Sequence, residues 1–411
     1  MQQIVILGGG TAGSLLAARF VRALGARARV TVVDRDDAHL YQPGLLFLPF
    51  NEEGPEAIVR SRRGLLPPEV DFVEAEVVSI DRAARRVRLS TGAALPWDLL
   101  VVATGARLVP EATEGLTGPG WRESVHEFYS LEGSMALRRA LRDFPGGPVL
   151  VHIAETPIKC PVAPLEMAFL LDAHLRAEGR RAGSEITYVT PLDGAFTRPT
   201  ARRVLGDTLD GRGIGTVADF AVQRVEAGPE GGTLIGWDGR ALPFRLLITV
   251  PVHAADPCIA AAGLGDAAGW LAVDKHTLQS TVDPTVFGLG DVTDLPTSKA
   301  GSVAHFAGEV LFENALRALD GRPPVARFDG HANCFVETGD GRAMLLDFNY
   351  ETEPLPGRFP LPGVGPFTLL EESEMNHWGK LAFRWVYWNL LVKGADLPLD
   401  HRMLTAGKWS A

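Results

Sequence analysis

Near the N-terminus, the hydrophobic residues form two short continuous runs with a helical repeat between them. Residues 4–7 read Ile-Val-Ile-Leu, apolar residues then recur at helical spacing up to Leu24, and residues 30–33 form a second run that ends in Asp34. Continuous apolar runs of this length are typical of strands buried on both faces, whereas a 3.6-residue repeat predicts an amphipathic helix. The pattern therefore predicts a strand–helix–strand unit.

The same alternation of strands and helices continues along the chain. The pattern predicts strands at 70–81, 86–89, 99–103, 148–153, 186–189, 233–235, 245–250 and 286–291, and helices at 131–142, 164–177 and 303–319. The strands at 233–235 and 245–250 are expected to pair with each other. Glycine and proline are dense at 110–120, which indicates a crossover between domains. This order predicts an α/β fold with two Rossmann-like three-layer domains, the first of them discontinuous.

From about Pro323 the pattern changes. A hairpin is expected at 334–338 and 343–348, followed by an aromatic helix from about Glu374 to Val392. Apolar residues recur at helical spacing on this helix: Trp378, Leu381, Ala382, Trp385, Trp388 and Val392. Aromatic residues interleaved with basic ones suit the headgroup zone of a bilayer and predict a membrane-facing segment, with packing against the first domain as the alternative. The expected domains are 1–110 with 265–322, then 111–264, and 323–411.

Composition and charge narrow the classes of function. The chain has 411 residues, of which 46% are hydrophobic and 22% charged, as is usual for globular domains. A formal net charge of −10 argues against a nucleic-acid partner. No cleavable signal peptide is evident, because the first apolar run lacks a basic stretch before it. The uncharged run at 385–392 of the tail is shorter than the ~20 residues that cross a bilayer, so a peripheral membrane location is expected.

A glycine motif lies between the first predicted strand and helix. Gly8, Gly10 and Gly13 fit G-x-G-x-x-G. In this motif the first glycine permits a tight turn, the second lets a pyrophosphate approach the backbone at a helix N-terminus, and the third allows close packing of helix and strand. Asp34 ends the next strand, where a carboxylate can accept hydrogen bonds from a ribose diol. The motif with its context predicts a dinucleotide site.

The three cysteines are widely separated and form no C-x-x-C pair, which excludes a disulfide-rich scaffold and leaves no predicted metal site. Cys160 follows Lys159 near the predicted start of a helix, so we expect a lowered thiol pKa. Cys334 begins a predicted strand 174 residues later, and sequence alone does not bring it to Cys160. Cys258 has no motif around it and is interpreted as structural.

Further motifs make the chain resemble a known family. The glycine motif, Val-Val-Ala-Thr-Gly-Ala at 101–106 and Gly-Leu-Gly-Asp at 288–291 resemble the FAD-dependent pyridine nucleotide–disulfide oxidoreductases. More narrowly, the chain is similar to the sulfide:quinone oxidoreductases. This narrower resemblance rests on Tyr-Gln-Pro-Gly at 41–44, Pro-Ile-Lys-Cys-Pro at 157–161, Thr-Ser-Lys-Ala-Gly at 297–301, Cys-Phe-Val-Glu-Thr-Gly at 334–339 and Trp-Gly-Lys at 378–380.

The resemblance implies a binding site for FAD. Its residues are expected to be Gly8, Gly10, Thr11, Ala12, Gly13, Asp34, Gln42, Pro43, Val77, Thr104, Gly105, Gly290, Asp291, Lys299, Ala300 and Gly301. Asp291 matches the family aspartate that bonds the ribitol. Lys299 is expected to place positive charge near the flavin pyrimidine, with a surface lysine as the alternative. Residues 123–130 lack the cysteine that attaches FAD covalently in part of the family, so non-covalent FAD is expected.

The resemblance also implies an activity. In the family, the cysteines that match Cys160 and Cys334 meet on one face of the flavin. The implied function is FAD-dependent oxidation of sulfide to polysulfide or zero-valent sulfur, with electrons passed to a membrane quinone. Hydrosulfide would attack a disulfide of the two cysteines, and we favour Cys160 as the leaving sulfur.

Sulfide, quinone and a lipid surface are the expected partners, and a homo-oligomer is left open. The alternatives are a type II NADH:quinone oxidoreductase and a non-catalytic flavin-binding signalling protein.

Three further observations bear on this activity. Residues 154–157 read Ala-Glu-Thr-Pro where a second dinucleotide site would need a glycine turn, and Glu155 would repel a pyrophosphate. NADH is therefore not expected to be the donor. Glu166 is a candidate proton carrier, although an acid in the first turn of a helix is the favoured interpretation. His305 is a candidate for a quinone site, with a packed core histidine as the alternative.

Overall fold

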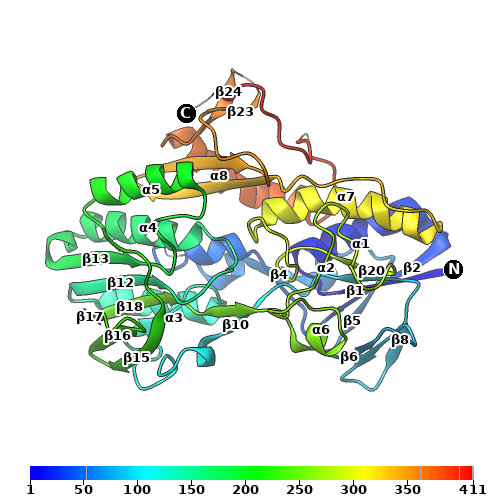
Figure 1. Ribbon diagram of the computed structural model, residues 1–411, viewed down its shortest axis with the longest axis horizontal. Helices are drawn as coiled ribbons and strands as arrows, with labels where there is room; N and C mark the ends of the chain where they lie inside the picture. The colour runs from blue at the N-terminus through cyan, green and yellow to red at the C-terminus, as the bar shows by residue number, and fades with distance from the viewer. Residues whose placement is uncertain (52, 362, 398, 410–411) are drawn as a thin grey trace.

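The computed structural model describes residues 1–51, 53–361, 363–397 and 399–409. Its first large sheet is parallel, with strand order β20-β9-β1-β2-β5. These strands are β1 (Gln2–Leu7), β2 (Ala28–Asp34), β5 (Val70–Glu74), β9 (Leu99–Val102) and β20 (Val286–Gly288). Helices α1 (Thr11–Leu24) and α7 (Gly301–Leu319) cover one face, and a smaller sheet of β6 (Val77–Asp81), β7 (Arg86–Leu89) and β8 (Ala94–Pro96) lies beyond the other (Figure 1).

The second large sheet repeats this arrangement with order β11-β18-β12-β13-β14. Its strands, all parallel, are β11 (Val125–His126), β12 (Gly147–Ile153), β13 (Ser184–Val189), β14 (Gly215–Val217) and β18 (Leu246–Val250). Helices α4 (Ala163–Ala177) and α5 (Pro199–Gly211) lie on one side (Figure 1). Helix α3 (Leu131–Asp143) and a sheet of β15 (Val222–Gly228), β16 (Gly231–Gly236) and β17 (Ala241–Phe244) lie on the other.

Two antiparallel strands join the two halves of the molecule. Strand β10 (Arg107–Val109) pairs with β19 (Val252–Ala254), so both chain crossovers run through one ribbon. The remaining short elements are β3 (Ala38–Leu40), β4 (Val59–Ser61), α2 (Arg62–Leu65), α6 (Pro257–Ala261) and the 3₁₀ turn η2 (Gln42–Leu46).

The tail packs across the top of both halves in the view of Figure 1. It contains the hairpin β21 (Ala332–Gly339) and β22 (Arg342–Phe348), the hairpin β23 (Gly357–Leu361) and β24 (Gly365–Leu369), and helix α8 (Glu374–Val386). A π-helical segment, Tyr387–Leu391, continues α8. Within the described ranges, none of the helices has both the length and the apolar character needed to cross a membrane.

The structure confirms the α/β class and the two Rossmann-like three-layer units, and most predicted elements lie within two residues of their observed positions. Two predictions were wrong. The stretch 70–81, expected as a strand, is divided between β5 of the first sheet and β6 of the smaller sheet. The strands expected at 233–235 and 245–250 do not pair, because β16 pairs with β15 and β17 while β18 lies between β11 and β12. Apolar content alone does not distinguish a strand of a central sheet from one of a covering sheet.

Candidate functional site

The glycine turn after β1 is shaped by close backbone contacts. Gly8 has a φ of +95°, and a Cβ there would lie 2.3 Å from the carbonyl oxygen of Ala103. A Cβ on Gly13 would lie 1.9 Å from the carbonyl oxygen of Gly8. A Cβ on Gly10, by contrast, would meet nothing within 4 Å, and Gly10 caps the N-terminus of α1. Two glycines therefore form the turn, while the third leaves open space at a helix N-terminus that favours anions.

Asp34 lies at the end of β2, as predicted, but it already has partners in the protein. Its carboxylate accepts hydrogen bonds from the backbone N–H of Gly9 at 2.7 Å and of Arg35 at 2.8 Å. It also lies 3.3 Å from the guanidinium of Arg62. The binding of a ribose by Asp34 therefore stays a prediction.

Arg62 was missed by the sequence analysis. Its buried guanidinium donates to the carbonyl oxygens of Gly9 at 2.9 Å and Ala38 at 3.0 Å. A Cβ on Gly9 would lie 2.3 Å from the Arg62 side chain, so this arginine packs directly against the glycine turn. No local sequence signal identifies it, because the contact spans 53 residues.

A second group of predicted residues lies at the carboxyl ends of β9 and β20. The Oγ1 of Thr104 is buried with no hydrogen-bond partner among the described residues. Burial raises the pKa of Asp291, against the opposing effect of the cations Lys159 and Lys299. The ammonium of Lys299 donates to the carbonyl oxygens of Asp291 at 2.9 Å and Thr293 at 2.6 Å. Burial lowers the pKa of Lys299 to about 8.

The remaining predicted cofactor residues line the same edge of the first sheet or lie in neighbouring loops. Gln42 and Pro43 begin η2, and Val77 begins β6. Gly105 and Gly290 have φ of +71° and +81°. Ala300 is the N-cap of α7, and a Cβ on Gly301 would meet nothing within 4 Å.

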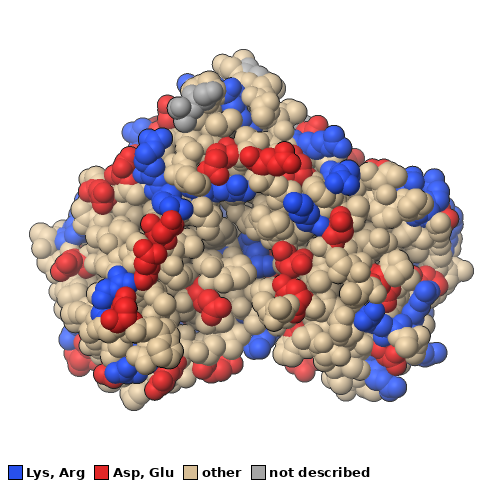
Figure 2. Space-filling view, in the orientation of Figure 1, with Lys and Arg blue, Asp and Glu red and all other residues tan. Residues whose placement is uncertain are grey.

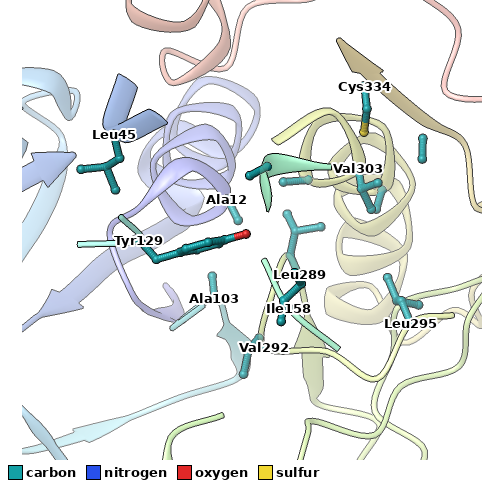
Figure 3. Packing of buried hydrophobic residues seen from close by; sticks show 14 of the residues in the cluster. Ala12, Leu45, Ala103, Tyr129, Ile158, Leu289, Val292, Leu295, Val303 and Cys334 are labelled. Carbon is teal, nitrogen blue, oxygen red and sulfur yellow. The ribbon is translucent and has the colours of Figure 1, made fainter. Parts of the chain in front are cut away.

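The arrangement fits a dinucleotide that carries an aromatic ring system. Open helix N-termini of α1 and α7, an orphaned hydroxyl and a buried acid line the carboxyl edge of the first sheet. Between them lie the apolar side chains of Ala12, Ala103 and Leu289, grouped around the ring of Tyr129 (Figure 3). Figure 2 shows that this face of the molecule is hollowed between the two halves.

The loop after β12 carries Cys160. Cys160 has a φ of +45°, and its N–H donates to the carbonyl oxygen of Lys299 at 2.7 Å. Residues 159 and 299 form a parallel bridge, so this loop is attached to the loop before α7. Cys334 is buried on β21, which packs against α4 (Figure 3). The N–H of Glu337 on the same strand donates to the Glu166 carboxylate of α4 at 2.7 Å, so the strand of Cys334 lies against the helix that follows Cys160. Both cysteines are free thiols in this structure.

The expected low pKa of Cys160 is wrong. Burial, reinforced by the nearby Glu166 carboxylate, raises the pKa of Cys160 far above its ordinary value and that of Cys334 to about 12. Helix α4 begins at Ala163 rather than directly after the cysteine, and the ammonium of Lys159 lies over the Tyr129 ring at 5.9 Å. Neither the dipole nor the lysine therefore offsets the loss of water around the sulfur.

A buried ionic cluster lies next to the two cysteines. Glu166, 1% exposed, forms an ion pair with Lys380 of α8 and accepts a hydrogen bond from the N–H of Glu337 at 2.7 Å. The carboxylate of Glu337, also 1% exposed, accepts from Nδ1 of His377 at 2.9 Å. Lys380 lowers the pKa of both thiols, in opposition to Glu166. Glu166 is thus more than an acid of the first helical turn, which was the favoured interpretation.

The surroundings of His305 are those of a histidine packed in the core. It is 2% exposed, and neither ring nitrogen has a hydrogen-bond partner among the described residues. Burial lowers its pKa to about 4, so it is neutral at pH 7.

The second domain has no dinucleotide-binding turn in the described residues. Strand β12 ends at Ile153, and residues 154–162 separate it from α4. Glu155 is exposed on this loop. The predicted lack of a glycine turn therefore agrees with the observed geometry.

The chain is similar to known proteins in sequence and in fold. Residues 2–151 match the family described as Pyridine nucleotide-disulphide oxidoreductase. The chain is 26% identical to the mitochondrial sulfide:quinone oxidoreductase of Mus musculus, over 95% of this chain and 86% of that protein. It is 31% identical to the ferredoxin–NAD(+) reductase component of the biphenyl dioxygenase system of Paraburkholderia xenovorans, over 72% of this chain and 69% of that protein.

A solved structure supports the same fold. The X-ray structure of the sulfide:quinone oxidoreductase from Aquifex aeolicus superposes with a TM-score of 0.79 at 22% identity, covering 95% of this chain and 92% of that one. At this identity the superposition supports the fold over 95% of the chain and nothing more specific.

Proposed function

The chain belongs to the pyridine nucleotide–disulphide oxidoreductase family, and from this premise we propose that it is a flavoprotein that oxidises sulfide and passes the electrons to a membrane quinone. The observation that carries the proposal is that β21, with Cys334, packs against α4, the helix after the Cys160 loop, beside the predicted dinucleotide site. The domain boundaries 1–110 with 265–322, 111–264 and 323–411 are part of it.

The extent of similarity favours sulfide over NADH as the donor. Relatives named as mitochondrial sulfide:quinone oxidoreductases align with 95% of the chain, and hence with Cys334 and the tail. Relatives named as NADH dehydrogenase-like proteins and ferredoxin reductases align with 71–72% of it, but so does the sulfide-quinone reductase of Aquifex aeolicus, so this argument rests on the three mitochondrial relatives. Together with the loop at 154–162, this supports a second domain that supplies a thiol instead of a nicotinamide site.

FAD is the cofactor that fits the site. The N-termini of α1 and α7 with Gly10 would hold its phosphates and pyrimidine end, and Asp291 with Thr104 would bond its polar linker. When bound, FAD supplies a two-electron acceptor that the protein itself lacks. No cysteine is present at 123–130, so we propose that FAD is held without a covalent bond.

The two cysteines carry out the sulfur chemistry. Hydrosulfide attacks one sulfur of a Cys160–Cys334 disulfide, which leaves a persulfide on that cysteine and a thiolate on the other. A second hydrosulfide takes the outer sulfur and leaves as hydrogen disulfide anion. Re-forming the disulfide from the remaining thiol and thiolate then releases one proton and two electrons, which FAD would accept. The net change converts two HS⁻ into HSS⁻, H⁺ and two electrons.

The surrounding charges set which sulfur can leave. The argument for Cys160 as the leaving group no longer holds, because burial raises the pKa of Cys160 instead of lowering it, and it raises the pKa of Cys334 as well. Lys380 is the cation that stabilises a thiolate here, since it lowers the pKa of both sulfurs. Its ion pair with Glu166 keeps it buried next to them.

The exposed side of α8 is proposed to lie on a bilayer. Trp378 and Trp385 are each 62% exposed and Leu381 is 40% exposed, while Trp388 and Val392 are buried against the first domain. Lys380 and Arg384 are engaged with Glu166 and Glu53, so attachment would rest on apolar insertion. Whether the chain is a homo-oligomer stays a prediction.

Membrane attachment is tested by flotation with lipid vesicles. The double variant Trp378→Ser with Trp385→Ser should lose most flotation and keep its thermal midpoint, because both side chains project from the protein. Trp237→Ser, which removes a tryptophan that is 70% exposed on the second domain, is the matched control and should float like the wild type. Equal flotation of the double variant and wild type would contradict attachment through α8.

The activity is tested by anaerobic stopped-flow of the purified holoprotein. Sulfide should bleach the flavin band rapidly, whereas stoichiometric NADH should not, because the second domain lacks a pyrophosphate turn. Fast reduction by NADH with no reaction to sulfide would instead support an NADH:quinone oxidoreductase.

A further inference from the structure

Tyr387 links the tail to the glycine turn of the first domain. It is the first residue of the π-helical segment Tyr387–Leu391 and is 2% exposed. Its hydroxyl lies 2.8 Å from Oγ1 of Thr11 and 2.7 Å from Nε2 of His39. Nδ1 of the same histidine lies 3.1 Å from the carbonyl oxygen of Gly9. Thr11 is the first residue of α1, so this chain of hydrogen bonds reaches both sides of Gly10.

The direction of each proton in this chain is fixed. The carbonyl oxygen of Gly9 can only accept, so Nδ1 of His39 must carry the ring proton. Burial, with the nearby Arg62 guanidinium, lowers the pKa of His39 to about 4, so at pH 7 the ring is neutral and Nε2 is an acceptor. The Tyr387 hydroxyl therefore donates to His39 and accepts from the Thr11 hydroxyl. Each group has one role, and replacing the tyrosine hydroxyl leaves two polar groups without partners.

The rest of the tail holds Tyr387 in place. Its ring packs 4.8 Å from that of Tyr41, and the Arg60 guanidinium lies 4.5 Å over the adjacent Trp388. Arg22 of α1 donates to the carbonyl oxygens of Lys393 at 3.0 Å and Gly394 at 2.9 Å. The residues from Tyr387 to Gly394 therefore pack against α1.

We propose that the tail is a clasp for the cofactor, in which Tyr387 is a positioning residue that holds the Gly9–Thr11 backbone in its phosphate-binding shape through His39 and Thr11. The inference rests on the FAD part of the proposed function and is independent of sulfide as the substrate. Tyr387 does not touch the reacting atoms. Its effect should therefore appear in cofactor affinity rather than in the chemistry of the cysteines.

The test is the FAD dissociation constant of full-length protein, measured from free FAD fluorescence on dilution of the holoprotein. Tyr387→Phe should raise this constant about ten- to hundred-fold, since it leaves buried polar groups unpaired. Tyr188→Phe removes a hydroxyl that is equally buried in the second domain, where it donates to Ala195, and should leave the constant unchanged. Thr11→Val should weaken FAD binding, while Thr11→Ser, which keeps the hydroxyl, should not.

A double-mutant cycle separates positioning from general stability. If Tyr387 acts through Thr11, Tyr387→Phe in the Thr11→Val background should cost clearly less than in the wild type. A Tyr387→Phe protein that melts earlier at saturating FAD but keeps the wild-type dissociation constant would overturn the inference, as would full additivity of the two changes. If Tyr387→Phe does not fold, His39→Phe, which removes the other partner of the Tyr387 hydroxyl, should raise the constant in its place, and an unchanged constant would overturn the inference. Absence of flavin reduction by sulfide in the wild type would defeat the proposed function and leave the clasp intact.

Discussion

The turn after β1 and the loop after β12 occupy equivalent places in two sheets that share the order of four of their five strands, yet they are built for different chemistry. The first passes directly through Gly8, Gly10 and Gly13 into α1, and it leaves open space at the helix N-terminus. The second inserts residues 154–162 before α4, and this longer loop carries Cys160 to the edge of the first domain. One fold thus supplies a phosphate site in one copy and a thiol in the other.

The sharpest way to break this comparison is to remove the thiols. Cys160→Ser and Cys334→Ser should each retain FAD but lose sulfide-dependent quinone reduction by several orders of magnitude, because residues that act as a unit fail together. The measurement is quinone reduction in the presence of sulfide, with bound flavin quantified from the absorption spectrum.

Cys258→Ser is the matched control for the cysteine variants. Cys258 is also buried, but it lies on α6, and none of the hydrogen bonds of the described residues joins it to Cys160 or Cys334. The variant should therefore keep a turnover near that of the wild type. Wild-type turnover in either of the other two variants would show that the paired cysteines are not the site of sulfide oxidation.

The first turn can be tested without disturbing the protein itself. Gly10 has a φ of −74°, which alanine adopts freely, and a Cβ there meets no protein atom within 4 Å. Gly10→Ala should therefore leave folding unchanged but weaken FAD binding by about tenfold or more, because only a ligand would meet the methyl group. Titration of bound FAD and a thermal melt measure the two effects.

Gly183→Ala in the second domain provides the comparison. It also places a Cβ in open space, and it should change neither FAD binding nor the melt. If Gly10→Ala bound FAD as tightly as Gly183→Ala, the open space beside Gly10 would not be the pyrophosphate site.

A smaller effect should appear as acid sensitivity in both halves. Burial lowers the pKa of His39 in the first domain to about 4 and that of His152 on β12 to about 3. As the pH falls, the unfolded state protonates these histidines before the folded state does. Their contribution to the free energy of unfolding is therefore fully present above about pH 6.5. It is lost as the pH falls toward 4, by about 1.4 kcal/mol per pH unit for each such histidine.

Urea unfolding at pH 7 and pH 5 measures this dependence. His152→Gln should flatten the pH dependence by about one proton, since glutamine can keep a hydrogen bond to Thr249 without titrating. An unchanged slope in this variant would mean that His152 does not stay neutral in the folded protein.

The strands and the glycine turn of the first domain could be predicted from the sequence because their signals are local. The apolar runs at 4–7 and 30–33 predicted β1 and β2, and the glycine spacing predicted the turn between them, because each of these features is set by neighbouring residues. The equivalent loop of the second domain was predicted only as the lack of a glycine turn. Its approach to the first domain depends on a bridge between residues 159 and 299, which no local pattern encodes.

The charges of the site were the least predictable part. The expected low pKa of Cys160 considered Lys159 and a helix start, both local, but the observed shift follows from burial and from Glu166. Glu166 in turn is held by Lys380, 214 residues later. Arg62 and Tyr387 were missed for the same reason: their contacts with the glycine turn join segments that only the folded chain brings together.

The hydrogen bond between Thr11 and Tyr387 has a consequence for biosynthesis. The glycine turn is among the first segments to leave the ribosome, but the tyrosine that completes its support is translated 376 residues later. Although domains fold progressively from the N-terminus during synthesis, the first domain also needs strand β20 and helix α7 from the later part of the chain. Nascent chains stalled before the tail are therefore expected to bind flavin weakly, and the full affinity should appear only once the tail has been synthesised.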